Sequence, residues 1–441
     1  MAPIPPIAPH ALLLLLLQVG LLLLLALALG RLAIKLRLPA VVGELCAGVL
    51  LGPSLLHVVA PGPSAWLIPQ QAEQFHLLDA VGQIGVLLLV GLTGAHLDLK
   101  LIRRQGSAAV KVSGFGLVVP LGFGVVTGLL LPQSLVGNRD QTVFAVFLGV
   151  AMCVSAIPVI AKTLIDMNLM HRDIGQLTLT AGMVDDAFGW LMLSVVSAMA
   201  TTGLRIGSIG VSLALLAGVI VFAVVAGRPL TRTAFRLAAR SEEATPTIAT
   251  TVVLILLASA GTHVLGLESV FGAFIMGLLI SGYGKPDPVK LAPLRTVVLA
   301  VFAPVFFATA GLRMDLTALA RPKVLGFALL ILAVAIAGKF IGAYLGARTS
   351  RLGKWEALAL GAGMNARGVI EVIVAMVGLR LGVISTEVFT IIILVAVVTS
   401  VIAPPILRVA MSRVRLTPEE DERRQAHLGL VQPAPVLERV G

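Results

Sequence analysis

The sequence predicts an all-α integral membrane protein with about thirteen transmembrane helices. Of the 441 residues, 58% are hydrophobic and only 12% are charged, whereas a soluble domain has roughly 25% charged residues. A membrane-spanning helix takes about 20 mostly apolar residues, so this apolar content fills roughly a dozen spans. These proportions exclude a soluble enzyme, a nucleic-acid-binding protein and a disordered protein. The net charge of +11 then indicates orientation in the membrane.

Apolar segments follow one another along the chain, with short polar loops between them. They cover residues 11–30, 39–58, 80–97, 107–131, 142–165, 175–201, 206–226, 247–266, 267–282, 296–312, 324–346, 356–378 and 386–408. We expect the first segment to be a retained helix and not a signal peptide, because residues 1–10 contain no Lys or Arg and basic residues follow the apolar run. Cys46 and Cys153 lie inside apolar segments, which predicts small buried side chains and no disulfide or Cys-based metal site.

The loops differ in charge between the two sides of the membrane. If every segment crosses once, most of the loop lysines and arginines fall on one side. The opposite side carries few of them: Arg139, Arg205, Arg313, Arg321, Lys323 and Arg380. Positively charged loops stay in the cytoplasm. We therefore expect a cell-membrane protein with its N-terminus outside and its C-terminus in the cytoplasm. The polar tail from Met411 to Gly441 is expected to be solvated and partly helical or disordered.

Two segments resemble each other. Residues 148–152 read Leu-Gly-Val-Ala-Met and residues 360–364 read Leu-Gly-Ala-Gly-Met. They lie in the fifth and twelfth segments, and this odd offset makes the copies cross the membrane in opposite directions. Inverted repeats with interrupted helices are typical of secondary transporters. We expect an N-terminal helix and loop (1–38), a first repeat (39–201), a linker helix and basic loop (202–246), a second repeat (247–408) and a cytoplasmic tail (409–441).

Residues that weaken helices stand in both copies. The first copy is followed by Ser155 and Pro158. The second contains Gly361 and Gly363 and is followed by Gly368. Proline has no N–H group and obstructs the preceding turn. Backbone groups freed at that depth are tolerated only where they line a cavity or are buried in protein. Glycine and proline also serve packing in membrane helices, but their paired occurrence favours a site at two discontinuous helices, lined by Ser155, Pro158 and Asn365.

Charged residues inside the apolar segments require a partner or a function, since each costs about 3 kcal/mol or more at a helix centre. Asp185 and Asp186 stand near the middle of the sixth segment, between apolar turns. Adjacent helical residues point about 100° apart, so the two carboxylates can contact different partners. Burial and a like charge favour the protonated carboxyl, whereas a nearby cation favours the ionised form. We therefore expect Asp185 and Asp186 to bind a proton or a cation in competition.

Other intramembrane charges suggest supporting roles. Lys339 lies deep in the eleventh segment and is the expected counter-ion of one of the aspartates. Arg367 and Glu371 are four residues apart, which predicts an ion pair on one helical face. Both a structural role and a direct transport role stay open for this pair. Glu44 is expected to cap or brace an early helix. Two lysines nearer the helix ends are expected to extend towards the membrane surface: Lys111 and Lys162.

Several sequence blocks stand in an order shared with a known family. They are 38–56 (LPAVVGELCAGVLLGPSLL), 155–164 (SAIPVIAKTL), 184–186 (VDD), 271–278 (FGAFIMGL), 304–316 (PVFFATAGLRMDL) and 365–372 (NARGVIEV). Together they resemble the monovalent cation:proton antiporters of the sodium/hydrogen exchanger superfamily, in the second cation:proton antiporter branch. The resemblance covers roughly residues 30–408.

This resemblance implies the sodium/proton antiporter fold, in which a core domain with two crossed, unwound helices stands beside a dimerisation domain. It implies that Asp186 carries the cation and the proton, that Asp185 pairs with a lysine, here Lys339, and that exchange is electrogenic. The implied partners are Na⁺ or K⁺, protons, the lipid bilayer and a second copy of the chain, and no cofactor, resident metal or nucleic acid is expected. His96 replaces a familiar acidic residue. Without the large regulatory region of the potassium-efflux members, control by nucleotides or thiol ligands is not expected.

Two other functions stay open at the level of the sequence. The first is a cation channel, although the chain has neither a carbonyl-filter motif nor an Arg-rich voltage-sensing helix. The second is a proton-coupled exporter of an organic cation or metabolite, which an unusually wide site cavity would favour. Na⁺ and K⁺ are both hard cations bound by oxygen atoms, so the sequence predicts either as substrate.

Overall fold

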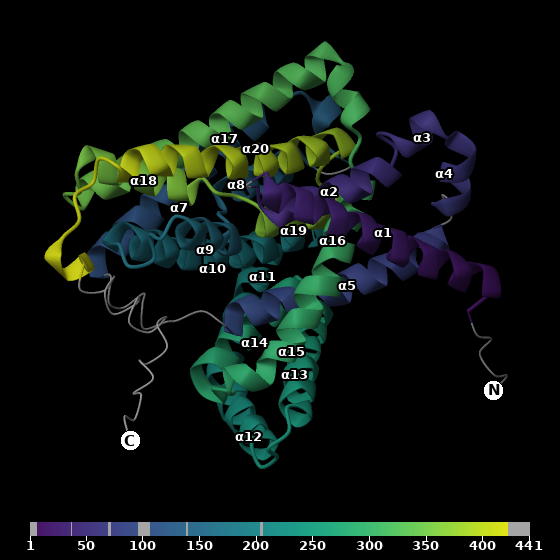
Figure 1. Cartoon of the computed structure of the whole chain (residues 1–441), viewed down its shortest axis with the longest axis horizontal. Coiled ribbons are helices and arrows are strands. Elements are labelled where there is room, and N and C mark those ends of the chain that lie inside the picture. Colours follow the sequence, from purple (N-terminus) through teal and green to yellow (C-terminus); the bar gives the residue numbers. More distant parts are fainter. Residues whose placement is uncertain are drawn as a thin grey trace, which may run out of the picture.

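The computed structural model describes residues 7–36, 38–68, 72–95, 106–137, 140–202 and 206–421. Nearly all of these residues are helical (Figure 1). Val136 and Ile384 form an isolated antiparallel bridge. The fold is therefore all-α, as predicted.

Eight helices pack together as one group, which we call the core group. They are α7 (Gly106–Leu130), α8 (Gln141–Cys153), α9 (Ile157–Asp166), α10 (Asp173–Thr202), α17 (Pro322–Thr349), α18 (Lys354–Met364), α19 (Val369–Arg380) and α20 (Thr386–Met411). Within it α7 lies along α17, where glycines permit close approach. A Cβ atom on Gly342 would lie 2.4 Å from the carbonyl oxygen of Phe115. Small residues at such contacts let the backbones of membrane helices meet.

The remaining long helices form a second group, which we call the scaffold group. They are α1 (Pro9–Lys35), α2 (Ala40–Leu51), α5 (Ala72–Ala95), α12 (Arg228–Ala238), α13 (Thr245–Val264), α14 (Ser269–Leu279), α15 (Pro288–Val297) and α16 (Ala303–Leu312). The linker helix α11 (Ile206–Phe222) packs against α10 and leads through a π-helical turn, η2 (Ala223–Gly227), into α12. In Figure 1 the core group occupies the upper left, whereas α12 to α15 extend below it.

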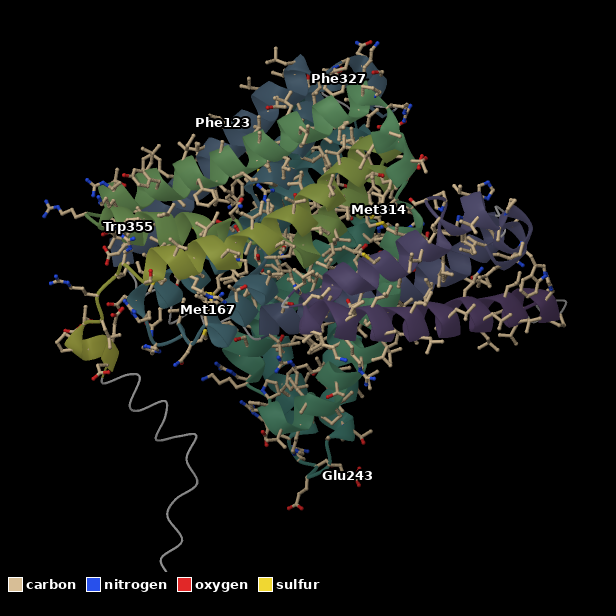
Figure 2. All side chains as sticks on the ribbon, turned by 45° about the horizontal axis from the view of Figure 1, so that its top comes forward. Phe123, Met167, Glu243, Met314, Phe327 and Trp355 are labelled. Atoms are coloured by element: carbon tan, nitrogen blue, oxygen red, sulfur yellow. The ribbon has the colours of Figure 1, made fainter. Side chains whose placement is uncertain are left out.

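Short elements complete the described chain. They are α3 (Leu56–Val59), α4 (Pro61–Leu67), η1 (Gln133–Leu135), η3 (Ile280–Gly284), η4 (Val298–Phe302) and η5 (Leu316–Ala320). Many large apolar side chains remain on the outside of the bundle, among them Phe123, which is 39% exposed on α7. Phe123 and Phe327 lie on the outer side of the α7–α17 layer (Figure 2). An apolar exterior of this extent is what a protein surrounded by lipid requires.

The expected number of about thirteen spans is not confirmed. Ten helices in the described residues are long and apolar enough to cross a membrane, or eleven if the bent pair of α18 and α19 counts as one span. The difference arises because two expected segments form short helices. The fifth segment breaks into α8 and α9, and the segment at 267–282 forms a helix of fewer than 18 residues, Ser269–Gly284.

The two interruptions meet inside the core group. Residues 154–156 separate α8 from α9, and residues 365–368 separate α18 from α19, which are bent by 47°. The backbone N–H of Ala156 donates to the carbonyl of Ala366 at 3.0 Å, so the two unwound stretches are joined. Pro158 stands in the first turn of α9, where its missing N–H group has no helical partner to lose. Breaks at corresponding places in two segments thus converge on one point.

The polar tail, expected over residues 411–441 to be solvated and partly helical or disordered, is helical at residues 418–421 but is not fully solvated. Helix α20 continues to Met411, and Glu420 is only 3% exposed. Glu420 lies 3.0 Å from Arg172 Nε and accepts a hydrogen bond from the backbone N–H of Asp173, the first residue of α10. A carboxylate is favoured at a helix N-terminus, which explains why this part of the tail folds back. Residues 422–441 lie outside the described residues.

Candidate functional site

Asp185 and Lys339 form an ion pair in the middle of the core group. Lys339 Nζ on α17 lies 2.5 Å from Asp185 Oδ2 on α10, and neither side chain has exposed surface. The ammonium also donates to the carbonyl of Gly116 on α7 at 3.1 Å. Ser155 Oγ, in the first interruption, lies 2.7 Å from both Asp185 Oδ2 and the carbonyl of Met364. These contacts connect α10, α17 and both interrupted helices at one buried point.

Asp186 is buried beside this pair and has no hydrogen-bond partner in the part of the chain that the structure describes. Its side chain has no exposed surface, and neither carboxylate oxygen has a hydrogen-bond partner among the described residues. The same holds for both amide atoms of Asn365, which follows α18 at the second interruption. A buried carboxylate without a partner is costly unless it binds a proton or a cation. The site therefore offers a free carboxylate next to one that is already neutralised.

Arg367 holds the second interruption against the first. Its Nη1 donates to the carbonyl of Ala151 at 2.9 Å and to Glu371 Oε1 at 3.1 Å. Its Nη2 donates to the carbonyl of Met152 at 2.5 Å. These carbonyls stand at the C-terminal end of α8, where a positive charge is favoured. The guanidinium thus caps one half-helix while it pairs with a carboxylate in the first turn of another.

The prediction of one helical face for Arg367 and Glu371 needs correction. Arg367 lies in the non-helical link at residues 365–368, and only Glu371 is helical. The two side chains still meet because the bend turns the link over the start of α19. The Oγ of Ser400, on α20, donates to the Arg367 carbonyl and helps to hold that link.

Other predicted residues take different places. Glu44 lies on α2 next to Gly30 of α1, in the scaffold group and not among the residues around Asp185. Lys111 is exposed and donates to the carbonyl of Thr349 at 3.3 Å, near the end of α17. His96 lies outside the described residues, as do the side chains of Pro158 and Lys162.

A second polar cluster consists of Ser197, Glu268 and Arg380, which the sequence does not predict. Glu268 directly precedes α14 and is 4% exposed. It accepts hydrogen bonds from Ser197 Oγ at 2.7 Å and from Arg380 Nη2 at 2.6 Å. The three residues stand at segment ends or in loops, where charge is ordinary, so no pattern in the sequence distinguishes them.

The site suits a small cation bound by oxygen atoms. Among the described residues, no group of three or more His, Cys, Asp or Glu could hold a resident metal ion. A cavity of about 310 Å³ lies elsewhere, near the end of α2, and its lining includes Gly52, His57, Ser64 and Phe75. Carboxylate, amide and carbonyl oxygens are the ligands that hard cations prefer. The oxygens of Asp186 and Asn365 are therefore candidate ligands, in competition with a proton on Asp186.

Comparisons with known proteins give a family match and similar relatives. Residues 20–413 match the family described as sodium/hydrogen exchanger, transmembrane. The chain is 32% identical over 387 residues to the Na(+)/H(+) antiporter NhaS4 of Synechocystis sp., which covers 87% of this chain and 93% of the relative. It is 28% identical over 382 residues to the K(+)/H(+) antiporter 1 of Saccharomyces cerevisiae, covering 84% of this chain but only 43% of the yeast protein.

A solved structure shares the fold. The sodium proton antiporter MjNhaP1 of Methanocaldococcus jannaschii, at pH 8, superposes with a TM-score of 0.69 and 18% identity, covering 91% of this chain and 99% of that one. Ten or eleven apolar spans within the described residues and the match to a transporter family make the chain an integral membrane protein. The sequence match, the crossed interruptions and the shared fold lead to one conclusion: this chain belongs to the transmembrane sodium/hydrogen exchanger family.

Proposed function

We propose that this protein is a secondary transporter that exchanges Na⁺ or K⁺ for protons across the membrane. The observation that carries the proposal is the state of Asp186, which is fully buried and has no partner in the described chain, beside an Asp185 already neutralised by Lys339. Such a carboxylate binds either a proton or a cation, so one excludes the other. Relatives named as Na⁺/H⁺ and K⁺/H⁺ antiporters support both cations as candidate substrates.

Charge balance around Lys339 supports electrogenic exchange. With a proton on Asp186 and Lys339 paired to Asp185, the three residues are neutral together. A cation that takes oxygens from both aspartates displaces Lys339, whose ammonium is then buried without a partner and releases its proton. Two protons then leave for each cation that enters, and the cycle moves net charge. Ser155 and the Gly116 carbonyl, which contact the pair, would hold it together again after the cation has left.

Alternating access is proposed to arise from movement of the core group against the scaffold group. Interrupted helices near mid-membrane are typical of transporters that work in this way. The two crossed interruptions support inverted repeats at 39–201 and 247–408. The loop charges support an external N-terminus and a cytoplasmic C-terminus in the cell membrane. A homodimer in the lipid bilayer is part of the same proposal.

The test is cation-driven pH change in proteoliposomes that contain the purified protein and a trapped pH dye. Addition of Na⁺ or K⁺ should release protons in the wild-type protein and should not do so in Asp186→Asn. Asp287→Asn is the matched control, because Asp287 is an exposed cap of α15 and lies outside the core group. Retained exchange in Asp186→Asn would contradict the assignment.

The same vesicles separate the alternatives. Cation flux that does not depend on the pH gradient would indicate a channel. A response to organic cations, with none to Na⁺ or K⁺, would indicate an exporter of larger substrates. A panel of alkali cations at a fixed pH then gives the preference between Na⁺ and K⁺.

A further inference from the structure

Glu268 is the centre of a contact that joins the two helix groups. It stands between α13 and α14 of the scaffold group, and both of its carboxylate oxygens are used. Oε1 accepts from Ser197 on α10 at 2.7 Å, and Oε2 accepts from Arg380, the last residue of α19, at 2.6 Å. Both donors belong to the core group. The Glu268 side chain is 5% exposed and that of Arg380 is 46% exposed, so the carboxylate is shielded from solvent whereas the arginine is not.

Two other ion pairs of the described chain have both charged residues in the same group. Arg313 and Asp79 pair at 2.6 Å between the end of α16 and α5, both in the scaffold group. Arg321 and Glu387 pair at 3.0 Å where α17 and α20 begin, both in the core group. The pair of Arg321 and Glu387 moves with its group, whereas Arg313 also donates from Nη1 to Met376 Sδ on α19 at 3.7 Å. The pair of Glu268 and Arg380 differs, because relative movement of the two groups has to stretch it.

The contact lies on one side of the candidate ion site. Ser197 is eleven residues beyond Asp186 on the same helix, which places it roughly 16 Å further along the axis. Arg380, at the end of α19, is one of the few basic residues on the side of the membrane that the charge distribution assigns to the outside. The cluster is therefore at the external end of the interface between the core and scaffold groups.

We infer that Glu268 is an external lock: it holds the core group against the scaffold group while the site is closed to the outside, and the lock breaks in every cycle. This inference rests on the proposed exchange function. A hydrogen-bonded buried carboxylate resists separation from its donors until water replaces them. Opening towards the outside supplies that water. Release of the lock and opening of the external path are thus one event.

A reversible cross-link tests whether the lock has to open. Glu268→Cys and Arg380→Cys are combined in a background with Cys46→Ala and Cys153→Ala, and a reducible bifunctional thiol reagent joins the two positions. We expect exchange in proteoliposomes to stop after cross-linking and to return after reduction. A cross-linked protein that exchanges at the rate of the reduced protein would overturn the lock. Absence of exchange in both the reduced variant and the wild-type protein would instead count against the proposed function.

Removing the charge of Glu268 tests how much the lock protects the interface from reagents added outside. Ala200, buried on α10 one turn beyond Ser197, is replaced by cysteine in the Cys46→Ala, Cys153→Ala background and labelled with an impermeant thiol reagent added from outside. Glu268→Gln should raise the labelling rate about ten-fold, the order expected from losing one charge-assisted hydrogen bond. The swap of Glu268→Arg with Arg380→Glu should restore protection.

Glu387→Gln is the matched control, since it breaks the ion pair with Arg321, at 3.0 Å, which lies within the core group. It should leave the labelling rate of the Ala200→Cys protein unchanged. Equal labelling rates in Glu268→Gln and its parent would overturn the lock, and so would an equal increase in Glu387→Gln. The labelling rates of the lock variant and of the control variant can be measured even if these proteins transport poorly.

Discussion

Replacing Lys339 with methionine removes the ammonium from a pair in which neither side chain has exposed surface. Asp185 Oδ2, at 2.5 Å, and the Gly116 carbonyl, at 3.1 Å, lose their donor together. Breaking a buried ion pair on one side costs about 3–5 kcal/mol, because the other charge stays buried. We expect the free energy of unfolding to fall by that amount, or by roughly two to four orders of magnitude in the unfolding equilibrium.

The loss should depend on pH in a defined direction. In the variant, the lone Asp185 avoids a buried charge by binding a proton in the folded state, and the unfolded chain releases that proton. A folded state that holds the extra proton loses stability as the pH rises. The free energy of unfolding of Lys339→Met should therefore be lower at pH 8 than at pH 6, by up to about 1.4 kcal/mol for each pH unit.

Unfolding of the purified protein in detergent, followed by fluorescence at pH 6, 7 and 8, measures both effects. Lys354→Met is the matched control, because Lys354 is exposed. Its ammonium nitrogen lies over the Trp355 ring, 5.9 Å from the ring centre. Lys339→Met combined with Asp185→Asn should regain much of the lost stability, since no charge is then left alone. The reasoning is refuted if Lys339→Met unfolds like the wild-type protein at all three pH values.

Three further predictions follow from other contacts. Arg367→Ala should lower the unfolding free energy by about 3–5 kcal/mol in the same assay, because it leaves Glu371 buried and unpaired; equal stability would contradict the capping role. Gly342→Ala should destabilise by about 1–3 kcal/mol, because its Cβ would overlap the Phe115 carbonyl; an unchanged midpoint would show that α7 and α17 can separate freely. Burial opposes the charge on Glu420, but backbone N–H donors and Arg172 outweigh it and lower its pKa. The ionised Glu420 carboxylate therefore adds to the free energy of unfolding at neutral pH. This contribution is lost only as the pH falls through the lowered pKa. Glu420→Gln should accelerate amide hydrogen exchange at the start of α10 at pH 7, and exchange equal to wild type would exclude the tail contact.

The intramembrane charges could be found in the sequence because charge inside an apolar segment is expensive and therefore stands out. Asp185, Asp186 and Lys339 were singled out for that reason. Their partners could not be found in the same way. Lys339 and Asp185 are 154 residues apart, and their contact depends on how α17 packs beside α10. The roles assigned to these residues in transport stay predictions until the variants are measured.

The interruptions show a similar division. Ser155, Pro158 and the glycines near 361–368 mark places where a helix is weak. They do not show that the N–H of Ala156 meets the carbonyl of Ala366, or that Arg367 leaves the helix to cap the end of α8. The predicted helical pairing of Arg367 with Glu371 was wrong in its geometry because local spacing assumes a continuous helix.

The class of this protein can be predicted from its sequence, since apolar segments of membrane length with polar loops between them are compatible only with a helical bundle in lipid. The sequence also determined which residues carry charge at membrane depth. The packing of the helices determines that Asp185 is neutralised by Lys339, whereas Asp186 has no hydrogen-bond partner among the described residues. The same packing brings Glu268 to Arg380 across the two helix groups. The reason is that partner choice depends on which helices lie side by side, and packing of that kind leaves no period or spacing along the chain.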